Sequence, residues 1–316
     1  MLADLNFAFL TTAPVFFIVA LGAWLKRQGW ISDEFVRVGS LLVFNISLPS
    51  LLFVKLVQTD FRQGLPLALV GYALLATTLA FILLDCWLGP WLARREDRGA
   101  FVQGVFRSNL GIVGLAYCLA AFGDAVLATV SIYLGLLTIL YNVLALITLS
   151  RHRDGPAGHG LNPSGLLRGI VSNPLILSIV AGGGLSLAGL TVPAVLLQTG
   201  GYFADLALPL ALLCTGASIR LREFRGSFTL YAAITGKLLL LPLAITAGGV
   251  LIGLRGMDLG VLYLMCAAPT AAASYPMARA MKANHHLAAA IVASTTLASI
   301  ISTTLGIFLL RSYALI

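Results

Sequence analysis

The chain has 316 residues, of which 59% are apolar and only 10% are charged, and its formal net charge is +8. A water-soluble domain is usually about 25% charged, so this composition excludes an ordinary soluble protein. It also excludes an intrinsically disordered chain, because disordered segments are poor in apolar residues. The basic residues form short clusters between long apolar runs, which is typical of a protein embedded in the lipid bilayer and not of one that binds nucleic acid.

Apolar runs follow one another along the chain, each about as long as a helix that crosses the hydrocarbon core of a bilayer. In the first half they lie at 7–25, 36–57, 65–88, 101–122 and 125–149. In the second half they lie at 169–187, 192–219, 228–254, 259–280 and 287–310. The sequence therefore predicts an all-α polytopic membrane protein of ten transmembrane helices, with a first five-helix repeat at 1–149, a polar cytoplasmic linker at 150–168 and a second five-helix repeat at 169–316.

The two halves resemble each other when one is shifted along the other by 160 positions. The coincident residues are Pro14 and Pro174, Gly22 and Gly182, Pro49 and Pro209, and Gly89 and Gly249. Because each half has an odd number of spans, the second half would insert with the opposite orientation. Inverted repeats of this kind are characteristic of secondary transporters, and we expect Pro49 and Pro209 to act as hinges in such a fold.

Loop charges predict the orientation in the membrane. Most Lys and Arg residues fall on one side of the predicted membrane, and the positive-inside rule makes this the cytoplasmic side of the cell membrane. Both termini are then expected outside the cytoplasm. His152, His159, His285 and His286 fall in loops on the cytoplasmic side, where we expect solvated side chains. The cysteines have no paired spacing, so neither a metal nor any other cofactor is expected.

The fourth predicted span contains residues that disfavour a continuous helix. They are Arg107, Ser108 and Asn109, followed by Gly111 and Gly114, which we expect to act as hinges. In lipid, an unpaired backbone amide or carbonyl is costly, so interrupted helices occur only where protein lines a cavity. The sequence therefore predicts a break in this span beside a binding site.

The ninth predicted span carries a matching break. It contains Pro269, Thr270, Ser274 and Tyr275, with Pro276 as a further hinge, and Pro269 has the same place in its repeat as the asparagine of the first break. Two crossed, broken helices would direct the positive N-terminal ends of half-helices at the middle of the membrane. Such a site suits a small organic anion, particularly a carboxylate. The residues predicted to bind this anion are Arg107, Ser108, Asn109, Pro269, Thr270, Ser274 and Tyr275.

Two ionisable residues lie well inside predicted spans, Asp205 in the seventh and Lys237 in the eighth. They are interpreted either as a structural ion pair or as a site that couples transport to H⁺ or Na⁺. Asn45 matches Asp205 across the repeat and is predicted to support the same polar region. On the coupling interpretation, Asp205→Asn would abolish flux while the protein remains stable.

Three further charges lie nearer the ends of their spans. Arg107 could pair with a substrate carboxylate or extend to the lipid headgroups. Asp85 and Lys55 are expected to pair locally or to reach the headgroups in the same way.

Several motifs together resemble the auxin efflux carrier family, in its bacterial malate- and malonate-permease form. They are Gln103-Gly-x-x-Arg107-x-Asn109-x-Gly111-x-x-Gly114, Leu208-Pro209-Leu-Ala-Leu and Ala268-Pro269-Thr270-Ala. The resemblance implies a ten-span inverted-repeat fold like that of the bile-acid sodium symporters, with spans four and nine crossed. It also implies that Asn109 and Pro269 lie beside a carboxylate substrate.

The predicted function is transport of small organic carboxylate anions such as malate, malonate or auxin by alternating access. Symport with H⁺ or Na⁺, uniport and exchange all stay open, as does assembly as a homodimer. One alternative is a sodium-coupled organic-anion symporter of the bile-acid type. Another is an integral-membrane enzyme acting on a lipid or prenyl substrate, although the acidic or histidine cluster that such an enzyme needs is missing from the sequence, so no enzyme is predicted.

Overall fold

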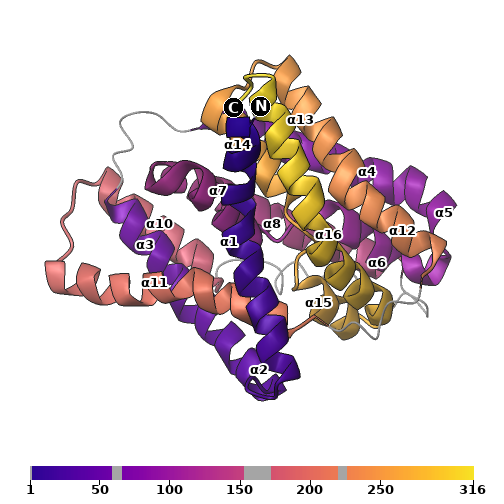
Figure 1. Ribbon diagram of the computed structural model, residues 1–316, viewed down its shortest axis with the longest axis horizontal. Coiled ribbons are helices and arrows are strands. Elements are labelled where there is room, and N and C mark those ends of the chain that lie inside the picture. The colour runs from indigo at the N-terminus through magenta and orange to yellow at the C-terminus, as the bar shows by residue number, and fades with distance from the viewer. Residues whose placement is uncertain (1, 59–65, 153–171, 220–225) are drawn as a thin grey trace.

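The computed structural model describes residues 2–58, 66–152, 172–219 and 226–316, and these residues form helices and no strands. Most of the predicted linker at 150–168 lies outside the described residues. The two chain ends lie close together (Figure 1), where Arg311 Nε is 3.5 Å from Asp4 Oδ1 and Gly256 N donates to Leu315 O at 2.8 Å.

The helices of the first half occupy the segments predicted from hydropathy. They are α1 (Leu2–Arg27), α2 (Asp33–Leu42), α3 (Leu48–Val57), α4 (Leu67–Leu83), α5 (Gly89–Leu92), α6 (Arg95–Phe106), α7 (Leu115–Phe122) and α8 (Leu127–Arg151). Those of the second half are α10 (Pro174–Leu187), α11 (Ala194–Ala217), α12 (Phe228–Thr235), α13 (Leu241–Leu251), α14 (Gly256–Ala267), α15 (Ser274–Ala280) and α16 (His285–Ser312). The all-helical class predicted from the sequence is therefore confirmed.

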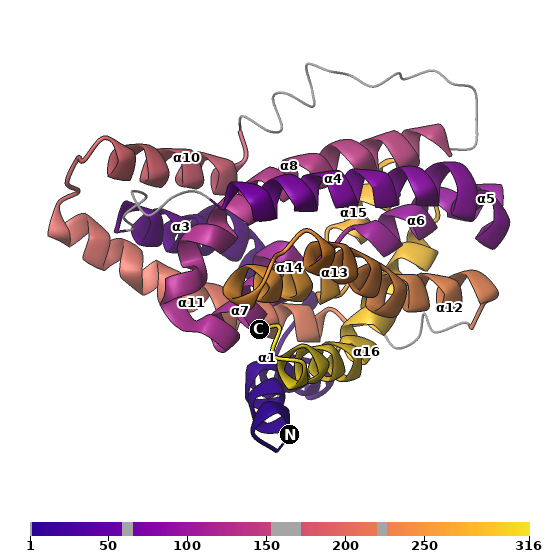
Figure 2. The same cartoon turned by 90° about the horizontal axis from the view of Figure 1, so that it is seen from above.

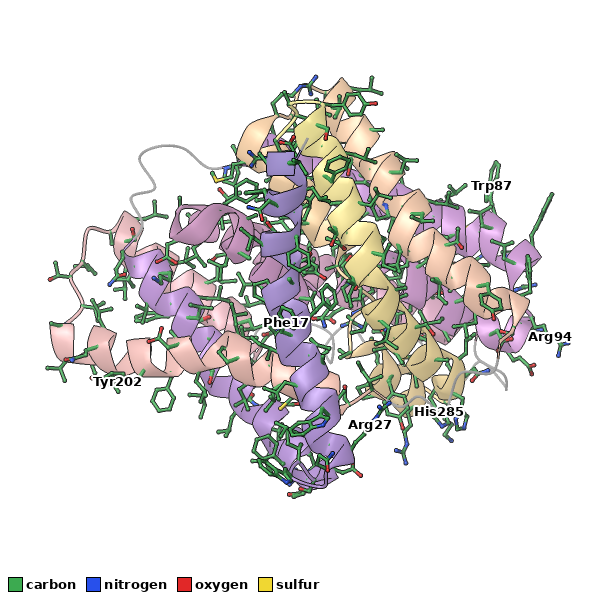
Figure 3. The ribbon with its side chains drawn as sticks, in the orientation of Figure 1. Phe17, Arg27, Trp87, Arg94, Tyr202 and His285 are labelled. Carbon is green, nitrogen blue, oxygen red and sulfur yellow. The ribbon has the colours of Figure 1, made fainter. Side chains whose placement is uncertain are left out.

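Seven helical stretches in the described part of the chain are long and apolar enough to cross a membrane. Two shorter apolar helices, α10 and α14, accompany them. Large apolar side chains cover the outer surface, and Phe17, Trp87 and Tyr202 are 69% exposed and point outward (Figure 3). So much exposed apolar surface is unfavourable in water, so this surface is suited to contact with lipid. The protein is thus a multi-pass membrane protein, and the count of ten spans stays a prediction.

Prolines explain why three of the long helices contain a widened, π-helical turn. The turns Val43–Ser47, Leu84–Leu88 and Gly236–Leu240 each end two residues before a proline, namely Pro49, Pro90 and Pro242. A proline has no amide hydrogen, and its ring collides with the carbonyl four residues earlier, so the helix widens to relieve the contact. Pro209 lies inside α11, which remains α-helical on both sides of it, so its role as a hinge stays a prediction.

The helices form two groups, best seen in Figures 1 and 2. The first, which we call the α1 group, contains α1, α2, α3, α10 and α11; the second, the α4 group, contains α4–α8 and α12–α16. Within the α1 group, α1 packs on α11, and α3 packs on both α10 and α11. Each group takes helices from both halves of the sequence, so the halves are interleaved in space.

Glycines allow α1 and α11 to approach each other closely. A side chain on Gly22 would overlap the carbonyl oxygen of Leu213, and one on Gly216 would overlap the carbonyl oxygen of Val19. Small residues have this role in membrane helix pairs, because dispersion contacts between backbones replace the hydrophobic effect that lipid removes. The α1–α11 contact therefore depends on two glycines.

We predict that Gly216→Ala lowers the thermal stability of the purified protein. Alanine in an open helical position gains about 0.5–1 kcal/mol over glycine, but overpacking costs about 1–3 kcal/mol. Gly201→Ala on the same helix is the matched control, because no atom lies within 4 Å of the added carbon. Thermal unfolding in detergent measures both variants, and equal melting temperatures would contradict the close α1–α11 contact.

Candidate functional site

Two interrupted helices meet in the α4 group. The first interruption separates α6 from a π-helical turn at Leu110–Gly114, and the second separates α14 from α15. Between them, the extended backbones of Ser108 and Thr270 form an isolated antiparallel bridge. Both interruptions lie at the residues where the sequence predicts them. We call this meeting point the crossover.

Backbone hydrogen bonds hold the crossover together. Asn109 N donates to Pro269 O at 2.8 Å, and Ala271 N donates to Arg107 O at 3.0 Å. These bonds satisfy backbone groups that a helix break would otherwise leave unpaired in lipid. Pro269 suits the position, because its nitrogen has no hydrogen and needs no partner. Backbone groups at each break are thus hydrogen-bonded by backbone groups at the other break.

A glycine brings the two interrupted helices together. A side chain at Gly114 would lie 2.8 Å from Met265 Sδ, which is too close for any larger residue without rearrangement. Gly114 and Gly111 both lie in the π-helical turn after the first break, and Pro276 lies in the first turn of α15, where a helix needs no amide hydrogen. These predicted hinge residues therefore all lie next to the crossover.

Lys237 lies at the crossover and is fully buried. Its Nζ donates to Ser108 Oγ at 2.5 Å and to Cys266 O at 3.0 Å, and Ser108 Oγ donates to Cys266 O at 3.1 Å. The ion pair considered between Lys237 and Asp205 does not form, since Asp205 is exposed on α11. Lys237 instead places a positive charge directly on the first break.

Arg107 is the second buried cation at the crossover. Its Nη2 donates to Asn142 Oδ1 at 2.7 Å and its Nη1 lies 3.0 Å from Met277 Sδ. It is only 7% exposed, so it does not reach toward the headgroups. Within the described residues, neither Arg107 nor Lys237 is bonded to a carboxylate.

The hydroxyl and amide groups predicted for substrate binding differ in whether they already have partners. Thr270 Oγ1 donates to Gly104 O at 2.6 Å, so its hydroxyl hydrogen already has a partner. Ser274 Oγ is buried and has no hydrogen-bond partner among the residues that the structure describes. The Asn109 side-chain amide likewise has no hydrogen bond to any described residue. Ser274 and Asn109 therefore retain hydrogen-bonding capacity for a ligand.

A cavity of about 650 Å³ lies between the α1 group and the crossover. Ile112 and Ala272, from the two interrupted helices, form part of its wall, together with Tyr275 and Pro276 of α15. Its basic residues are Lys26, Arg37 and Arg279, and its acidic residue is Asp33, 2.7 Å from Lys26. The sequence marked Arg279 only as a loop charge, because nothing in its spacing reveals that the last turn of α15 lines a cavity together with α2.

The remaining predicted support residues lie away from the crossover. Asn45 is exposed, and its Nδ2 donates to Leu41 O of the preceding turn at 2.8 Å. Asp205 is exposed on α11, and neither residue lines the cavity described above. The structure therefore does not bring Asn45 or Asp205 together with Lys237.

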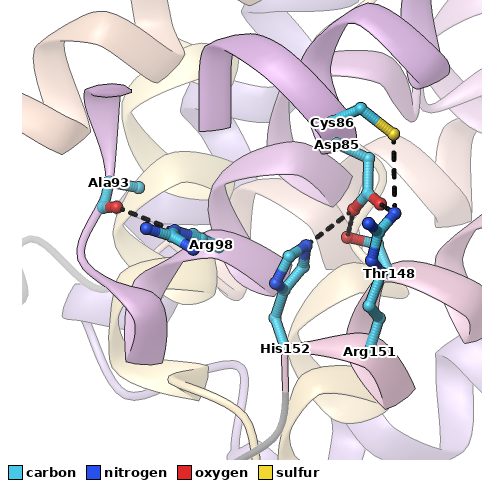
Figure 4. A network of polar contacts seen from close by, with 7 residues as sticks. All are labelled: Asp85, Cys86, Ala93, Arg98, Thr148, Arg151 and His152. Atoms are coloured by element: carbon cyan, nitrogen blue, oxygen red, sulfur yellow. Dashed lines mark hydrogen bonds and ion pairs between the residues drawn. The ribbon is translucent and has the colours of Figure 1, made fainter. Parts of the chain in front are cut away.

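Asp85 and Lys55 pair locally, which is one of the two outcomes that the sequence allows. Lys55 Nζ is 2.7 Å from Asp124 Oδ2. Asp85 accepts hydrogen bonds from Thr148 Oγ1 at 2.6 Å and Arg151 Nη1 at 2.8 Å, and His152 Nε2 is 2.9 Å from Asp85 Oδ1 (Figure 4). No group of His, Cys, Asp and Glu residues in the described part of the chain could hold a metal ion.

Comparisons with known proteins identify the family. The family model described as a membrane transport protein matches residues 7–155 and 161–307. An "Uncharacterized transporter" of Methanothermobacter thermautotrophicus is 25% identical over 304 residues, which cover 93% of this chain and 96% of the relative. The "Uncharacterized transporter YfdV" of Escherichia coli K12 is 24% identical over 310 residues, 94% of this chain and 96% of the relative.

A third relative, from Rhizobium meliloti, is named "Putative malonate transporter" and is 25% identical over 321 residues, 96% of this chain and 95% of the relative. These relatives are transporters and not enzymes, as the sequence predicted. The resemblance to the auxin efflux carriers is confirmed, and the chain belongs to the membrane transport protein family.

Proposed function

We propose that this transporter carries small organic carboxylate anions through the crossover. The observation that supports this most strongly is the pair of buried cations, Arg107 and Lys237, which have neutral partners only among the described residues. A buried charge without a counter-charge is costly, so such a site favours an anion that supplies the missing negative charge. A dicarboxylate such as malonate, the substrate in the name of the Rhizobium meliloti relative, has this chemistry.

The cavity supports an anionic substrate as well. Three basic side chains line it; Lys26 is paired with Asp33 and Arg37 with Glu34, whereas Arg279 has no ion-pair partner among the described residues. A positive side chain in a concave surface raises the local concentration of anions. An anion attracted by Arg279 would approach the crossover from the side rich in basic residues, which we propose is the cytoplasmic side.

We propose that the two halves are inverted repeats that give ten spans, arranged as in the bile-acid symporters. Packing contacts support this beyond the sequence match. Gly22 of α1 packs against Leu213 of α11, and a side chain added to Gly182 of α10 would lie 2.9 Å from the carbonyl oxygen of Phe53 in α3. Gly22 and Gly182 are 160 positions apart, and so are Phe53 and Leu213, so each contact maps onto the other. Alternating access would then follow from movement of the α4 group against the α1 group.

We infer that the crossover does not require a coupling sodium ion. A hydroxyl and a backbone carbonyl, the kinds of oxygen that bind Na⁺, converge here on Lys237 Nζ. The ammonium group would thereby supply the positive charge that a bound cation supplies in a sodium-coupled carrier.

Binding of a dicarboxylate should raise the melting temperature of the purified protein, because a ligand that binds the folded state alone stabilises it. Malonate is the test ligand, and neutral malonamide, which has nearly the same shape, is the matched control. We expect stabilisation by malonate and none by malonamide. Equal effects of the two compounds would rule out recognition of the negative charge.

Lys237→Met should reduce malonate uptake into proteoliposomes by about tenfold or more, because the charge that balances the substrate is removed. Asp205→Asn is the matched control, since it also neutralises one charge inside a predicted span. We expect Asp205→Asn to retain uptake, because Asp205 lies away from the crossover. Size-exclusion profiles show whether both variants fold. Uptake lost in folded Asp205→Asn but retained in Lys237→Met would assign the coupling role to Asp205 instead.

Replacing Na⁺ by choline on both sides of the proteoliposome membrane should leave malonate uptake unchanged. Uptake that rises with sodium concentration would favour the sodium-coupled alternative. That result would overturn the role given to the Lys237 ammonium without affecting the anionic nature of the substrate.

A further inference from the structure

A second polar cavity, of about 490 Å³, lies at the basic end of the molecule. Three separate parts of the chain form it: the start of α6, the end of α8 and the turn between α15 and α16. Its lining comprises Glu96, His152, Arg279, Lys282, Ala283, Asn284, His285 and His286. We call it the histidine cavity. None of the residues that form the crossover lines it, although Arg279 borders both this cavity and the larger one.

Basic groups dominate the histidine cavity. Its lining includes the basic side chains Arg279 and Lys282, and three imidazoles add positive charge when they are protonated. Glu96 is the acidic residue of the lining. The neighbouring Asp97 is engaged, because its Oδ1 accepts a hydrogen bond from Asn284 Nδ2 at 2.7 Å. The balance of charge therefore favours an anion.

A buried carboxylate holds one of the imidazoles in place. Asp85, whose side chain is 1% exposed, has its Oδ1 2.9 Å from His152 Nε2 (Figure 4). The same carboxylate accepts hydrogen bonds from Thr148 and Arg151, so its position is well determined. Nδ1 is then the His152 atom that can bond a ligand. Neither His152 nor its contact with Asp85 forms part of the proposed transport site.

The other two imidazoles begin a long helix. His285 and His286 are the first residues of α16, and their ring centroids are 4.2 Å apart. The side chain of Asn284 caps the helix by accepting from Leu287 N at 3.0 Å. The positive end of the α16 dipole therefore lies against the same cavity and adds to its attraction for an anion. The α16 dipole, the imidazoles and the side chains of Arg279 and Lys282 all favour the binding of an anion.

We propose that the histidine cavity binds a small dianionic oxyanion of the phosphate or sulfate type, separately from the transported substrate and more tightly at lower pH. Protonation of the histidines adds positive charge and hydrogen-bond donors, so affinity rises as pH falls. Among the described residues, the other ionisable groups around the cavity are Glu96 and Asp97 from α6, Asp85 and Arg151 beside His152, Tyr275 beside His285, and Arg279 and Lys282. Of these side-chain types, histidine alone ordinarily changes its charge near neutral pH, so pH would act on binding through the histidines.

Sulfate is the probe, because it remains a dianion throughout the range in which the histidines titrate. The full-length protein in nanodiscs of zwitterionic lipid is titrated with sulfate by calorimetry at about pH 6 and about pH 8, on either side of the ordinary histidine pKa. We expect binding that is tighter at the lower pH. Binding that does not change with pH, or no binding at the lower pH, would overturn the proposal.

The double variant Lys282→Gln/His286→Gln tests whether this cavity is the site. We expect its affinity for sulfate at the lower pH to fall about tenfold or more, since two charge-assisted hydrogen bonds are lost. Arg94→Gln is the matched control. Arg94 is exposed on the same basic surface and does not line the cavity (Figure 3). An equal loss in both variants would mean that sulfate senses only the general surface charge, and this would refute the site.

Two further binding measurements distinguish this site from the transport site and identify the source of the oxyanion. Folded Lys237→Met should bind sulfate normally, whatever its effect on malonate uptake; loss of sulfate binding there would contradict a separate site. In nanodiscs of anionic lipid, weaker sulfate binding would support the site with a lipid phosphate as its occupant. Unchanged sulfate binding in anionic lipid would support it with a free oxyanion from solution.

Discussion

The structure depends on satisfying the backbone of two broken helices in a surrounding that offers no water. An open amide or carbonyl in lipid costs several kcal/mol, so neither break is tolerable alone. The antiparallel bridge between Ser108 and Thr270, with the bond from Asn109 N to Pro269 O, lets each break satisfy the other. Because this pairing requires direct backbone contact, the two interrupted helices are fixed against each other, and the polar groups near the breaks acquire defined positions.

Charge balance follows from that geometry. The bridge places Ser108 where its hydroxyl accepts a hydrogen bond from Lys237, and it places Arg107 in a buried position against Asn142. Both cations have neutral partners, so the crossover carries positive charge that an anion can balance. On the proposed function, the Lys237 ammonium would take the place of a coupling cation. The crossover is thus suited both structurally and electrostatically to a carboxylate.

The basic end of the molecule also carries an excess of positive side chains. Arg279 borders the cavity that approaches the crossover and also the histidine cavity, so one side chain lies between two regions of positive potential. The two regions differ in the groups that supply their charge. Near the crossover these groups are Arg107 and Lys237, whereas in the histidine cavity they are Arg279, Lys282 and three imidazoles. The proposed transported anion and the proposed oxyanion would then be recognised separately in one protein.

The sequence by itself determined the membrane class, the positions of the helices and the two breaks, because apolar run length, proline and glycine act locally. It also placed Arg107, Asn109 and Thr270 correctly within the interrupted spans. Only the tertiary structure decided that Lys237 bonds to Ser108 while Asp205 lies exposed on α11, and that Arg279 borders two cavities. Which side chains meet across helices depends on helix rotation and packing, and hydropathy and residue spacing do not encode either.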